Sequence, residues 1–258
     1  MAVKLSVITV TYNNEDTIDS YLKTFQFLPD NSEVIIVDNN SHDRTVEKLR
    51  HYKTITVLPQ DENLGFGKSC NIGVKHSKGE YLLFLNPDTK LSKNGVSELI
   101  KFYDTHPDAG IVAPKLEEDS KTQPSVRKLP TIIGALKEYY LGMKGSYEAY
   151  APFGDQPIAV ESVVGAAVLM KRDLFNKIGG FSSKYFMYFE DLELCRQVLK
   201  QGFKVYYVPS VIFYHKVGAS FSEKKNQWIQ EASKKYHGYP YWLLLYLVLR
   251  LRPKKGRV

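Results

Sequence analysis

The chain has 258 residues, of which 43% are hydrophobic and 24% are charged, a balance typical of a globular protein rather than a disordered one. No apolar run reaches the roughly 20 residues that a membrane-spanning helix needs, and the N-terminus lacks the pattern of a signal peptide, so we expect a cytoplasmic protein. Cys70 and Cys195 are too few for a disulfide framework or a four-cysteine zinc site. Both fall in apolar, helix-like patterns, which predict buried thiols.

The formal net charge of +7 comes entirely from the C-terminal segment. Residues 221–258 hold nine Lys and Arg but only two Asp and Glu, whereas the other 220 residues carry 26 of each sign. This distribution argues against a nucleic-acid-binding face spread over the fold. It favours a local anionic partner, such as a membrane surface or a diphosphate.

Taken in chain order, the first half alternates between short apolar strands and helices. Strands are expected at 3–11, 33–37, 54–58, 80–85 and 110–113, and helices over 18–25, 43–50, 68–76 and 95–104. Nearly continuous apolar strands alternating with helices predict an α/β fold, in which a mostly parallel sheet carries helices on both faces.

The second half is less regular. Residues 116–160 form an insertion with one helix expected near 132–141, followed by a strand at 162–170, helices at 172–178 and 190–201, and strands at 203–208 and 211–214. A polar helix over 223–237 and nine apolar residues, 241–249, then precede a cluster of cations. We expect a domain at 1–220 and a helical tail at 221–258 that lies on a membrane surface. The alternative is a tail docked on the body or on a second subunit.

Polar side chains follow three of the expected strands. Thr11 and Asn13 come after the first strand, Asp38 and its neighbours after the second, and Asn86 and Asp88 after the fourth. Ligands of open α/β sheets bind outside the carboxyl ends of the strands, so these residues mark a candidate site.

Common nucleotide motifs do not match this chain. The sequence 67–69 (GKS) ends like a P-loop, but Glu62 stands where that motif needs glycine. The first strand is not followed by a glycine-rich turn, which argues against a dinucleotide-binding dehydrogenase.

Several carboxylates each have a functional and a structural interpretation. Asp38 suits a contact to a base or ribose, or a helix cap. Asp88 suits a divalent cation or an Asx turn. Glu190 and Asp191 begin a helix after an aromatic run, a setting that raises a carboxyl pKa towards the range of a general base or simply complements the helix dipole. His215 ends an apolar strand and is a metal ligand or a structural residue.

In this order along the chain, the motifs are similar to those of family 2 glycosyltransferases of the GT-A fold. The chain most resembles the bacterial rhamnosyltransferase branch, and the resemblance covers about residues 3–220. It rests on Asn71 and on the sequences at 6–13, 36–41, 63–67, 84–89, 164–170, 178–181, 186–191, 208–209 and 214–215.

The resemblance implies that a sugar passes from a nucleoside-diphosphate donor to an acceptor hydroxyl, with inversion at the anomeric carbon. Asp191 would be the general base, with Glu190 as the fallback. Asp88 would hold Mg²⁺ or Mn²⁺, with His215 as a second metal ligand or a diphosphate contact. The implied donor-binding residues are Thr11, Asn13, Asp38 and Asn39 at the nucleoside, Asn63, Gly65 and Asn71 as those that shape the loop beside the ribose and diphosphate, Asn86 in the metal motif, and Gly165 and Ala166 at the sugar. Basic residues after 221 would add charge stabilisation at the diphosphate, with Lys234 or Lys235 as the candidates.

The branch implies dTDP-L-rhamnose as donor and a lipid-linked saccharide as acceptor, in bacterial cell-surface polysaccharide or cell-wall synthesis at the inner face of the cell membrane. A UDP-hexose donor is the alternative, and a homodimer is left open.

A nucleotidyltransferase would need a glycine-rich signature after the first strand, which is missing. A non-catalytic sugar-nucleotide-binding protein is disfavoured because Asp88, Asp191 and His215 are all present. The Gln-x-x-Arg-Trp motif of processive polymerases is absent, which favours a single addition per encounter.

Overall fold

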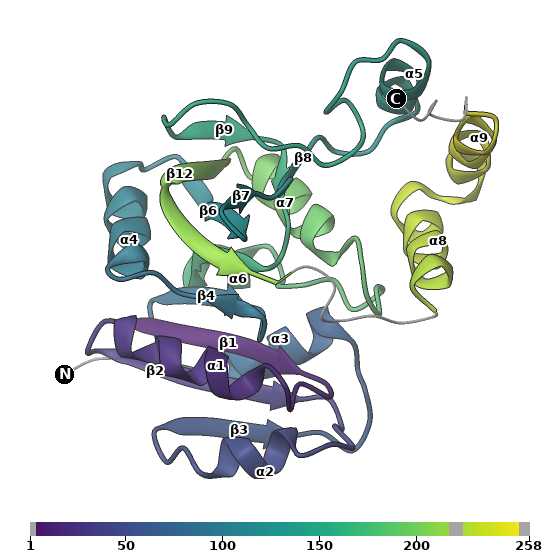
Figure 1. Ribbon diagram of the computed structural model, residues 1–258. Coiled ribbons are helices and arrows are strands. Elements are labelled where there is room, and N and C mark those ends of the chain that lie inside the picture. The colour runs from purple at the N-terminus through teal and green to yellow at the C-terminus, as the bar shows by residue number, and fades with distance from the viewer. Residues whose placement is uncertain (1–3, 217–223, 253–258) are drawn as a thin grey trace.

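A central twisted sheet lies between two layers of helices in the computed structural model, which describes residues 4–216 and 224–252 (Figure 1). The strand order of the main sheet is β3-β2-β1-β4-β11-β6-β12-β5. These strands are β3 (Ile55–Pro59), β2 (Ser32–Asp38), β1 (Leu5–Thr11), β4 (Tyr81–Leu85), β11 (Ala167–Lys171), β6 (Ala109–Glu118), β12 (Lys204–His215) and β5 (Thr89–Lys90).

Strand direction explains where the polar residues gather. β3, β2, β1 and β4 are parallel, and β12 is parallel to β6, whereas β11 runs antiparallel to both β4 and β6. The long strands other than β11 therefore all point the same way, which confirms the mostly parallel sheet. The amino end of β11 consequently lies at the same edge as the carboxyl ends of its neighbours.

The core follows the period-two alternation of the strands. In β4, Tyr81, Leu83 and Leu85 face one hydrophobic cluster, while Leu82 and Phe84 face the other. The first cluster is covered by α1 (Ile18–Leu22), α2 (Thr45–Arg50) and α4 (Gly95–Thr105). The second is covered by α3 (Phe66–Lys75), α6 (Arg172–Lys177) and α7 (Glu190–Lys200), and it holds the buried thiols Cys70 and Cys195.

The insertion contains β7 (Lys121–Thr122), β8 (Val126–Arg127), α5 (Ile132–Tyr140), β9 (Ile158–Val160) and β10 (Ser162–Val163). The helix expected near 132–141 is therefore confirmed. Thr131 caps α5 by accepting a hydrogen bond from the backbone N–H of Gly134 through its hydroxyl.

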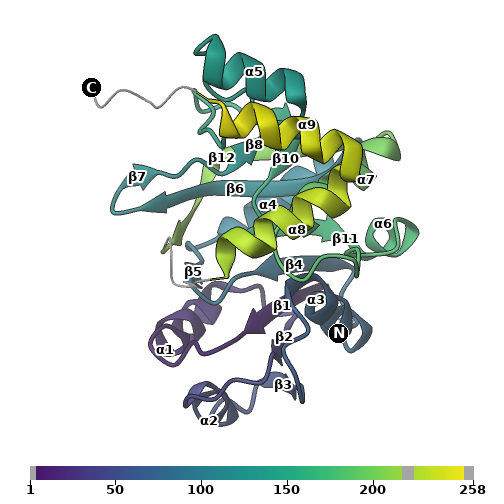
Figure 2. The same ribbon diagram turned by 90° about the vertical axis from the view of Figure 1, so that its right-hand side faces the viewer.

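The C-terminal segment is docked on the body as two helices, α8 (Lys225–His237) and α9 (Tyr239–Arg250). Ala232 and Tyr236 of α8 are buried against Tyr185 and Leu192. α9 lies beside α5, at the end of the molecule opposite β3 (Figure 2). No helix among residues 4–216 and 224–252 is long and apolar enough to cross a membrane. The predicted boundary at 220/221 and the last cations, from Lys254 onwards, lie outside the described residues.

Several element boundaries differ from the expectation. The strand expected at 110–113 is β6, which has ten residues and continues to Glu118, past the expected start of the insertion at 116. The strand expected over 162–170 is two strands, β10 and β11, separated by residues 164–166. The strands expected at 203–208 and 211–214 form one strand, β12, with a register shift between Val208 and Ile212. Pro209 lacks an N–H group for the ladder, so it produces an irregularity there instead of a break. The helix expected over 18–25 becomes α1 followed by a 3₁₀-helix, η1 (Lys23–Phe27).

Candidate active site

The buried carboxylate of Asp38, at the end of β2, connects the first two strands. Its Oδ1 accepts hydrogen bonds from the hydroxyls of Thr11 at 2.8 Å and Ser41 at 2.6 Å, and its Oδ2 accepts one from the backbone N–H of Ser41 at 2.8 Å. Asp38 is 1% exposed. Its carboxylate therefore braces the loop after β2 and does not cap the following helix, which begins only at Thr45; its contact with a nucleoside stays a prediction.

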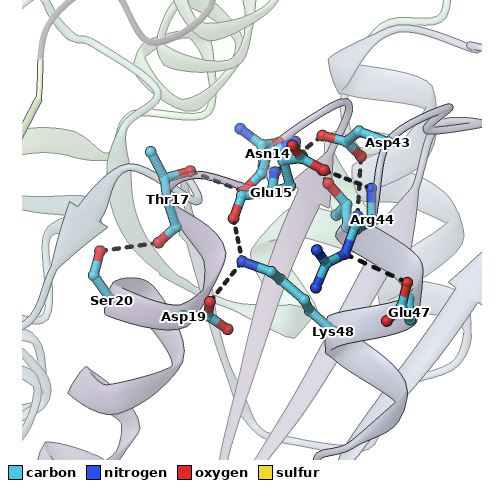
Figure 3. A network of polar contacts seen from close by, with 10 residues as sticks. Asn14, Glu15, Thr17, Asp19, Ser20, Asp43, Arg44, Glu47 and Lys48 are labelled. Carbon is cyan, nitrogen blue, oxygen red and sulfur yellow. Dashed lines mark hydrogen bonds and ion pairs between the residues drawn. The ribbon is translucent and has the colours of Figure 1, made fainter.

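The loops after β1 and β2 are joined by a polar network (Figure 3). Asn13, held at φ 53°, accepts a hydrogen bond from the backbone N–H of His42 at 2.8 Å. The backbone N–H of Glu15 donates to Asp43 at 3.0 Å, and that of Arg44 donates back to the Glu15 carboxylate at 2.8 Å. Lys48 completes the network with hydrogen bonds to the Glu15 carbonyl and the Asp19 carboxylate, both at 2.7 Å. These contacts fix the rim on which Asn13 lies.

Asn39 links the end of β2 to the loop that begins α3. Its Oδ1 accepts a hydrogen bond from the Ser69 hydroxyl, and its Nδ2 donates to the Gly65 carbonyl at 3.4 Å. Asn63 Oδ1 accepts from the Gly65 N–H at 3.0 Å. The carbonyl of Phe186 accepts from the N–H of Phe66 at 3.1 Å, so the 63–67 loop also touches the segment before α7.

Gly65 is the residue of this loop that tolerates no side chain. Its φ is +81°, and an added Cβ would lie 2.0 Å from the Phe186 carbonyl oxygen. Gly179 has the same φ of +81° but no heavy atom within 4 Å of such a Cβ. We therefore expect Gly179→Ala to cost about 1–2 kcal/mol of unfolding free energy, from backbone strain alone.

Gly65→Ala is expected to cost clearly more than Gly179→Ala and to lower turnover at least about tenfold, because Phe186 must move. Urea denaturation and a turnover assay on both variants measure these effects. Equal destabilisation by the two substitutions would show that the contact with Phe186 has no energetic weight.

Asn71, predicted to shape the same loop from the following helix, braces a different turn. It lies in α3, where its side-chain amide donates to the Phe181 carbonyl at 2.8 Å and accepts from the Phe181 N–H at 3.0 Å. Both hydrogen-bonding ends of the amide are thus engaged in holding the 179–181 turn, where Gly180 leaves room for it. The structure supports a bracing role for Asn71, and direct contact with a donor stays a prediction.

Asp88 and His215 come together at the sheet edge. Oδ1 of Asp88 is buried, accepts no hydrogen bond from any described residue, and lies 3.4 Å from Nε2 of His215. Gln123 holds the histidine from behind. Its Nε2 donates to the His215 carbonyl, which orients the amide so that Oε1 faces Nδ1 at 2.8 Å. Nδ1 therefore carries the proton, and in the neutral ring the lone pair of Nε2 points towards Asp88.

This pair fits a divalent cation. A buried carboxylate oxygen without a hydrogen-bond donor is costly unless a charge partner is present, and imidazole and carboxylate are both metal ligands. Within the described ranges, no cluster of three or more His, Cys, Asp or Glu could hold a metal ion. About four further ligands of an octahedral ion would have to come from water and from the phosphates of a substrate.

Gln123 should affect metal affinity through His215. We expect Gln123→Ala to weaken Mn²⁺ binding, measured by calorimetry with saturating nucleoside diphosphate, about 10- to 100-fold, because the imidazole loses its orientation. Gln26→Ala, at an exposed position in η1, is the matched control and should leave the affinity unchanged. Identical affinities for wild type and Gln123→Ala would remove Gln123 from the site.

Glu190 and Asp191 begin α7 and differ in surroundings. Glu190 is buried, and its Oε2 has no hydrogen-bond partner among the described residues. Asp191 is partly exposed, and its Oδ2 accepts a hydrogen bond from the N–H of Gly165 at 3.2 Å. Burial and the Asp191 charge raise the pKa of Glu190, and burial raises that of Asp191.

The backbone before this pair is strained. Tyr188 and Phe189 have φ values of 69° and 70°, in the left-handed region that bulky residues rarely adopt. Such conformations cost about 1–3 kcal/mol each and tend to cluster at functional sites. Here they set the direction of the carboxylates at the start of α7. Phe189 lies against α8, with its ring centroid 5.3 Å from that of Tyr236.

The antiparallel β11 brings the remaining predicted residues to the same edge. Gly165 and Ala166 directly precede β11, and the Ala166 carbonyl accepts a hydrogen bond from the N–H of Asn86 at 2.9 Å. An added Cβ at Gly165 would lie 3.5 Å from the Asp191 Cβ. Lys235 is exposed on α8, where it lines a small pocket with Phe186.

Three residues of the site were missed by the sequence analysis. Ser41 donates two hydrogen bonds to Asp38. Its position in the turn, two residues after Asn39, is a sequence feature that could have predicted this contact. Gln123 has no sequence signal, because it lies 92 residues from His215 in an irregular insertion. Arg127 of β8 is close enough to offset part of the rise in the Asp191 pKa, and it too follows no pattern.

Comparison with known proteins agrees with this geometry. The family described as "Glycosyl transferase family 2" matches residues 6–179, and "N-terminal domain of galactosyltransferase" matches residues 149–218. The chain is 28% identical over 236 residues to an N-acetylglucosaminyl-diphospho-decaprenol L-rhamnosyltransferase of Mycobacterium tuberculosis, covering 82% of this chain and 76% of that one. It is 26% identical to rhamnosyltransferase WbbL of Escherichia coli K12, covering 89% and 91%. It is 24% identical to dTDP-rhamnosyl transferase RfbF of Shigella flexneri, covering 84% and 71%.

Solved structures share the fold. GalNAc-T7, crystallised with UDP, GalNAc and Mn²⁺, superposes with a TM-score of 0.67 at 15% identity, over 83% of this chain and 44% of that chain. The mannosyltransferase PcManGT from Pyrobaculum calidifontis, in complex with GDP-Man and Mn²⁺, superposes with a TM-score of 0.65 at 18% identity, over 95% and 69%. The α/β architecture is thus the GT-A fold, and divalent metal use has a precedent in it.

Proposed function

Because this chain belongs to glycosyl transferase family 2, we propose that it transfers L-rhamnose from dTDP-L-rhamnose to a hydroxyl of a lipid-linked saccharide, inverting the anomeric carbon. The observation that carries this proposal is that one edge of the sheet holds both a carboxylate suited to be a general base, Asp191, and two side chains suited to bind a metal ion, Asp88 and His215. Asp191 has a raised pKa and partial exposure, and Asp88 faces His215 at 3.4 Å. One inverting displacement needs one base on the acceptor and charge stabilisation on the leaving group.

In this proposal, Asp191 takes the proton of the acceptor hydroxyl. Its hydrogen bond with the Gly165 N–H fixes the carboxylate beside the place where small residues, Gly165 and Ala166, leave room for the donor sugar. The loops braced by Asp38 and Asn39 hold the nucleoside. Asn13 and Asn63 lie on the rim of these loops.

Asp88 and His215 would bind Mg²⁺ or Mn²⁺, which when bound acts as a Lewis acid on the diphosphate. Gln123 keeps the Nε2 lone pair of His215 directed at that position. Lys235 would add positive charge near the diphosphate, beside Phe186.

The donor and acceptor are supported by what the relatives are named for. The three relatives described above are named as rhamnosyltransferases, one with dTDP and one with a diphospho-decaprenol acceptor. We place the reaction in the cytoplasm, at the inner face of a bacterial cell membrane. A hexose donor is the second candidate, favoured by the match of residues 149–218 to a galactosyltransferase domain.

A donor screen tests the proposal. Purified protein with Mg²⁺ or Mn²⁺ is exposed to dTDP-rhamnose, UDP-glucose, UDP-galactose and UDP-GlcNAc, with thermal shift and slow donor hydrolysis as readouts. We expect a metal-dependent response to dTDP-rhamnose that Asp88→Ala abolishes. A response only to a UDP-sugar would overturn the donor assignment, and no response to any donor would overturn the proposed activity.

A further inference from the structure

The insertion and the C-terminal tail meet in one structure. Helices α5 and α9 lie side by side (Figure 2), joined by a hydrogen bond from the Tyr140 hydroxyl to the Val248 carbonyl at 3.1 Å and one from the Ile132 N–H to the Tyr241 hydroxyl at 2.9 Å. The Arg252 guanidinium lies 5.0 Å from the centroid of the Tyr139 ring. These contacts make α5 and α9 a two-helix unit at one end of the molecule.

Each of the two helices exposes large apolar side chains along one of its sides. In α5 and its C-terminal turn, the exposed positions follow the spacing i, i+3, i+7, i+8, and in α9 they fall on the side opposite the buried Leu245. Exposure reaches 65% at Ile133, 57% at Leu244 and 73% at Leu251. We call this surface the α5–α9 face; it comprises Ile133, Leu136, Tyr140, Leu141, Met143, Tyr239, Leu243, Leu244, Leu247 and Leu251.

The charges around this face are mostly positive, although Glu148, which accepts a hydrogen bond from the Tyr139 hydroxyl at 2.9 Å, and the exposed Glu231 flank it. Residues 131–147 and 232–252 contain a single acidic residue, Glu138, which is buried and accepts hydrogen bonds from the N–H groups of Ser146 and Tyr147. The cations of the two segments are all exposed: Lys137, Lys144, Lys234, Lys235, Arg250 and Arg252. An apolar stripe rimmed by cations, with no exposed carboxylate in these segments, is complementary to an anionic lipid surface.

We propose that the α5–α9 face docks on an anionic bilayer surface, with both helices lying in the interfacial plane. The insertion thus supplies half of a membrane contact that the sequence assigns to the tail alone. A second copy of this chain fits the face poorly. In a two-fold dimer the same patch meets itself, which would bring the cations of α5 and α9 against those of the partner.

Such docking orients the proposed active site, and in this respect the inference rests on the proposed function. α8 precedes α9 by one residue, Gly238, and packs on the segment that carries Asp191 through Tyr236 and Phe189. A bilayer held at α9 would therefore lie next to the element that positions the proposed base. A lipid-linked saccharide could reach Asp191 without leaving the membrane surface.

The experiment is vesicle co-sedimentation of the full chain, with phosphatidylglycerol vesicles compared to phosphatidylcholine vesicles. Two variants test the halves separately: Ile133→Glu with Leu141→Glu on the α5 side, and Leu244→Glu with Leu247→Glu on α9. Lys53→Glu, in the turn between α2 and β3 at the opposite end of the molecule, changes the net charge by the same amount and is the matched control. Circular dichroism and donor thermal shift verify that each variant is folded.

We expect the wild type to bind the anionic vesicles and each double variant to bind them at least about tenfold more weakly, with Lys53→Glu close to wild type. Wild-type binding by the α5 variant would overturn the composite face. Loss of a dimer in sedimentation velocity, with vesicle binding unchanged, would assign the face to a second copy. Vesicle binding without any nucleotide-sugar response would overturn the proposed function and support the docking, and the reverse result would overturn the docking alone.

Discussion

Asp88→Asn is expected to lower kcat/KM about a thousandfold while leaving the protein at least as stable as the wild type. The asparagine keeps the shape of the side chain but removes its negative charge. That charge would bind a cation together with the Nε2 atom of His215, which lies 3.4 Å from the Oδ1 atom of Asp88. A divalent metal contributes several kcal/mol of charge stabilisation, and about 4 kcal/mol corresponds to this loss of rate. Stability should not fall, because Oδ1 is buried without a hydrogen-bond donor among the described residues.

The measurement is initial rate against Mn²⁺ concentration, together with a thermal melt. Asp155→Asn, an exposed aspartate in the insertion, is the control and should behave as wild type in both assays. Wild-type turnover in Asp88→Asn would contradict the metal assignment. A large drop in melting temperature would instead identify Asp88 as a structural Asx-turn residue, the interpretation that the sequence left open.

Much of the site could be predicted because parallel strands deliver their carboxyl ends to one edge. Thr11 and Asp38 are the last residues of β1 and β2, Asp88 follows β4, and the structure places all three at that edge. Gly165 and Ala166 were assigned only by resemblance. An apolar run carries no information on strand direction, so the reversal of β11, which brings their peptide groups to the edge, could not be read from it.

Long-range packing accounts for what was missed. The helix at 132–140 was predicted from its own pattern, but its pairing with α9 depends on contacts more than 100 residues apart, such as Tyr140 with Val248. Gln123 and His215, 92 residues apart, are a second long-range pair that no local pattern predicts. Amphipathic spacing tells which side of a helix is apolar, not which partner or solvent that side meets.

Asp191→Asn is expected to lower kcat by about 10²- to 10⁴-fold with donor affinity unchanged, the loss that follows removal of a general base. Glu190→Gln should keep most of the activity. Asp191 is partly exposed beside Gly165, where an acceptor hydroxyl can reach it. Glu190 is buried and faces α3, where burial and the Glu190 charge together raise the pKa of the Cys70 thiol. Single-turnover rates with saturating donor compare the two variants, and the opposite ranking would exchange their roles.

The pH dependence separates the two carboxyls further. Each has a folded-state pKa above its unfolded value, so the folded protein holds these protons to higher pH, and stability falls as pH rises from about 4 towards the raised values. Glu190→Gln removes one such group. Its gain in melting temperature should therefore be larger at pH 8 than at pH 5, and a gain that does not vary with pH would contradict the raised pKa.

The rate profile separates the two carboxyls as well. The Asp191 charge helps to raise the pKa of Glu190, so Asp191 is already ionised when Glu190 titrates, whereas the pKa of Asp191 is raised by burial. The acid limb of kcat is therefore expected to stay in place in Glu190→Gln and to be lost in Asp191→Asn. An acid limb that Asp191→Asn retains would mean that the proton lost in that limb belongs to another group, and that Asp191 is not the base.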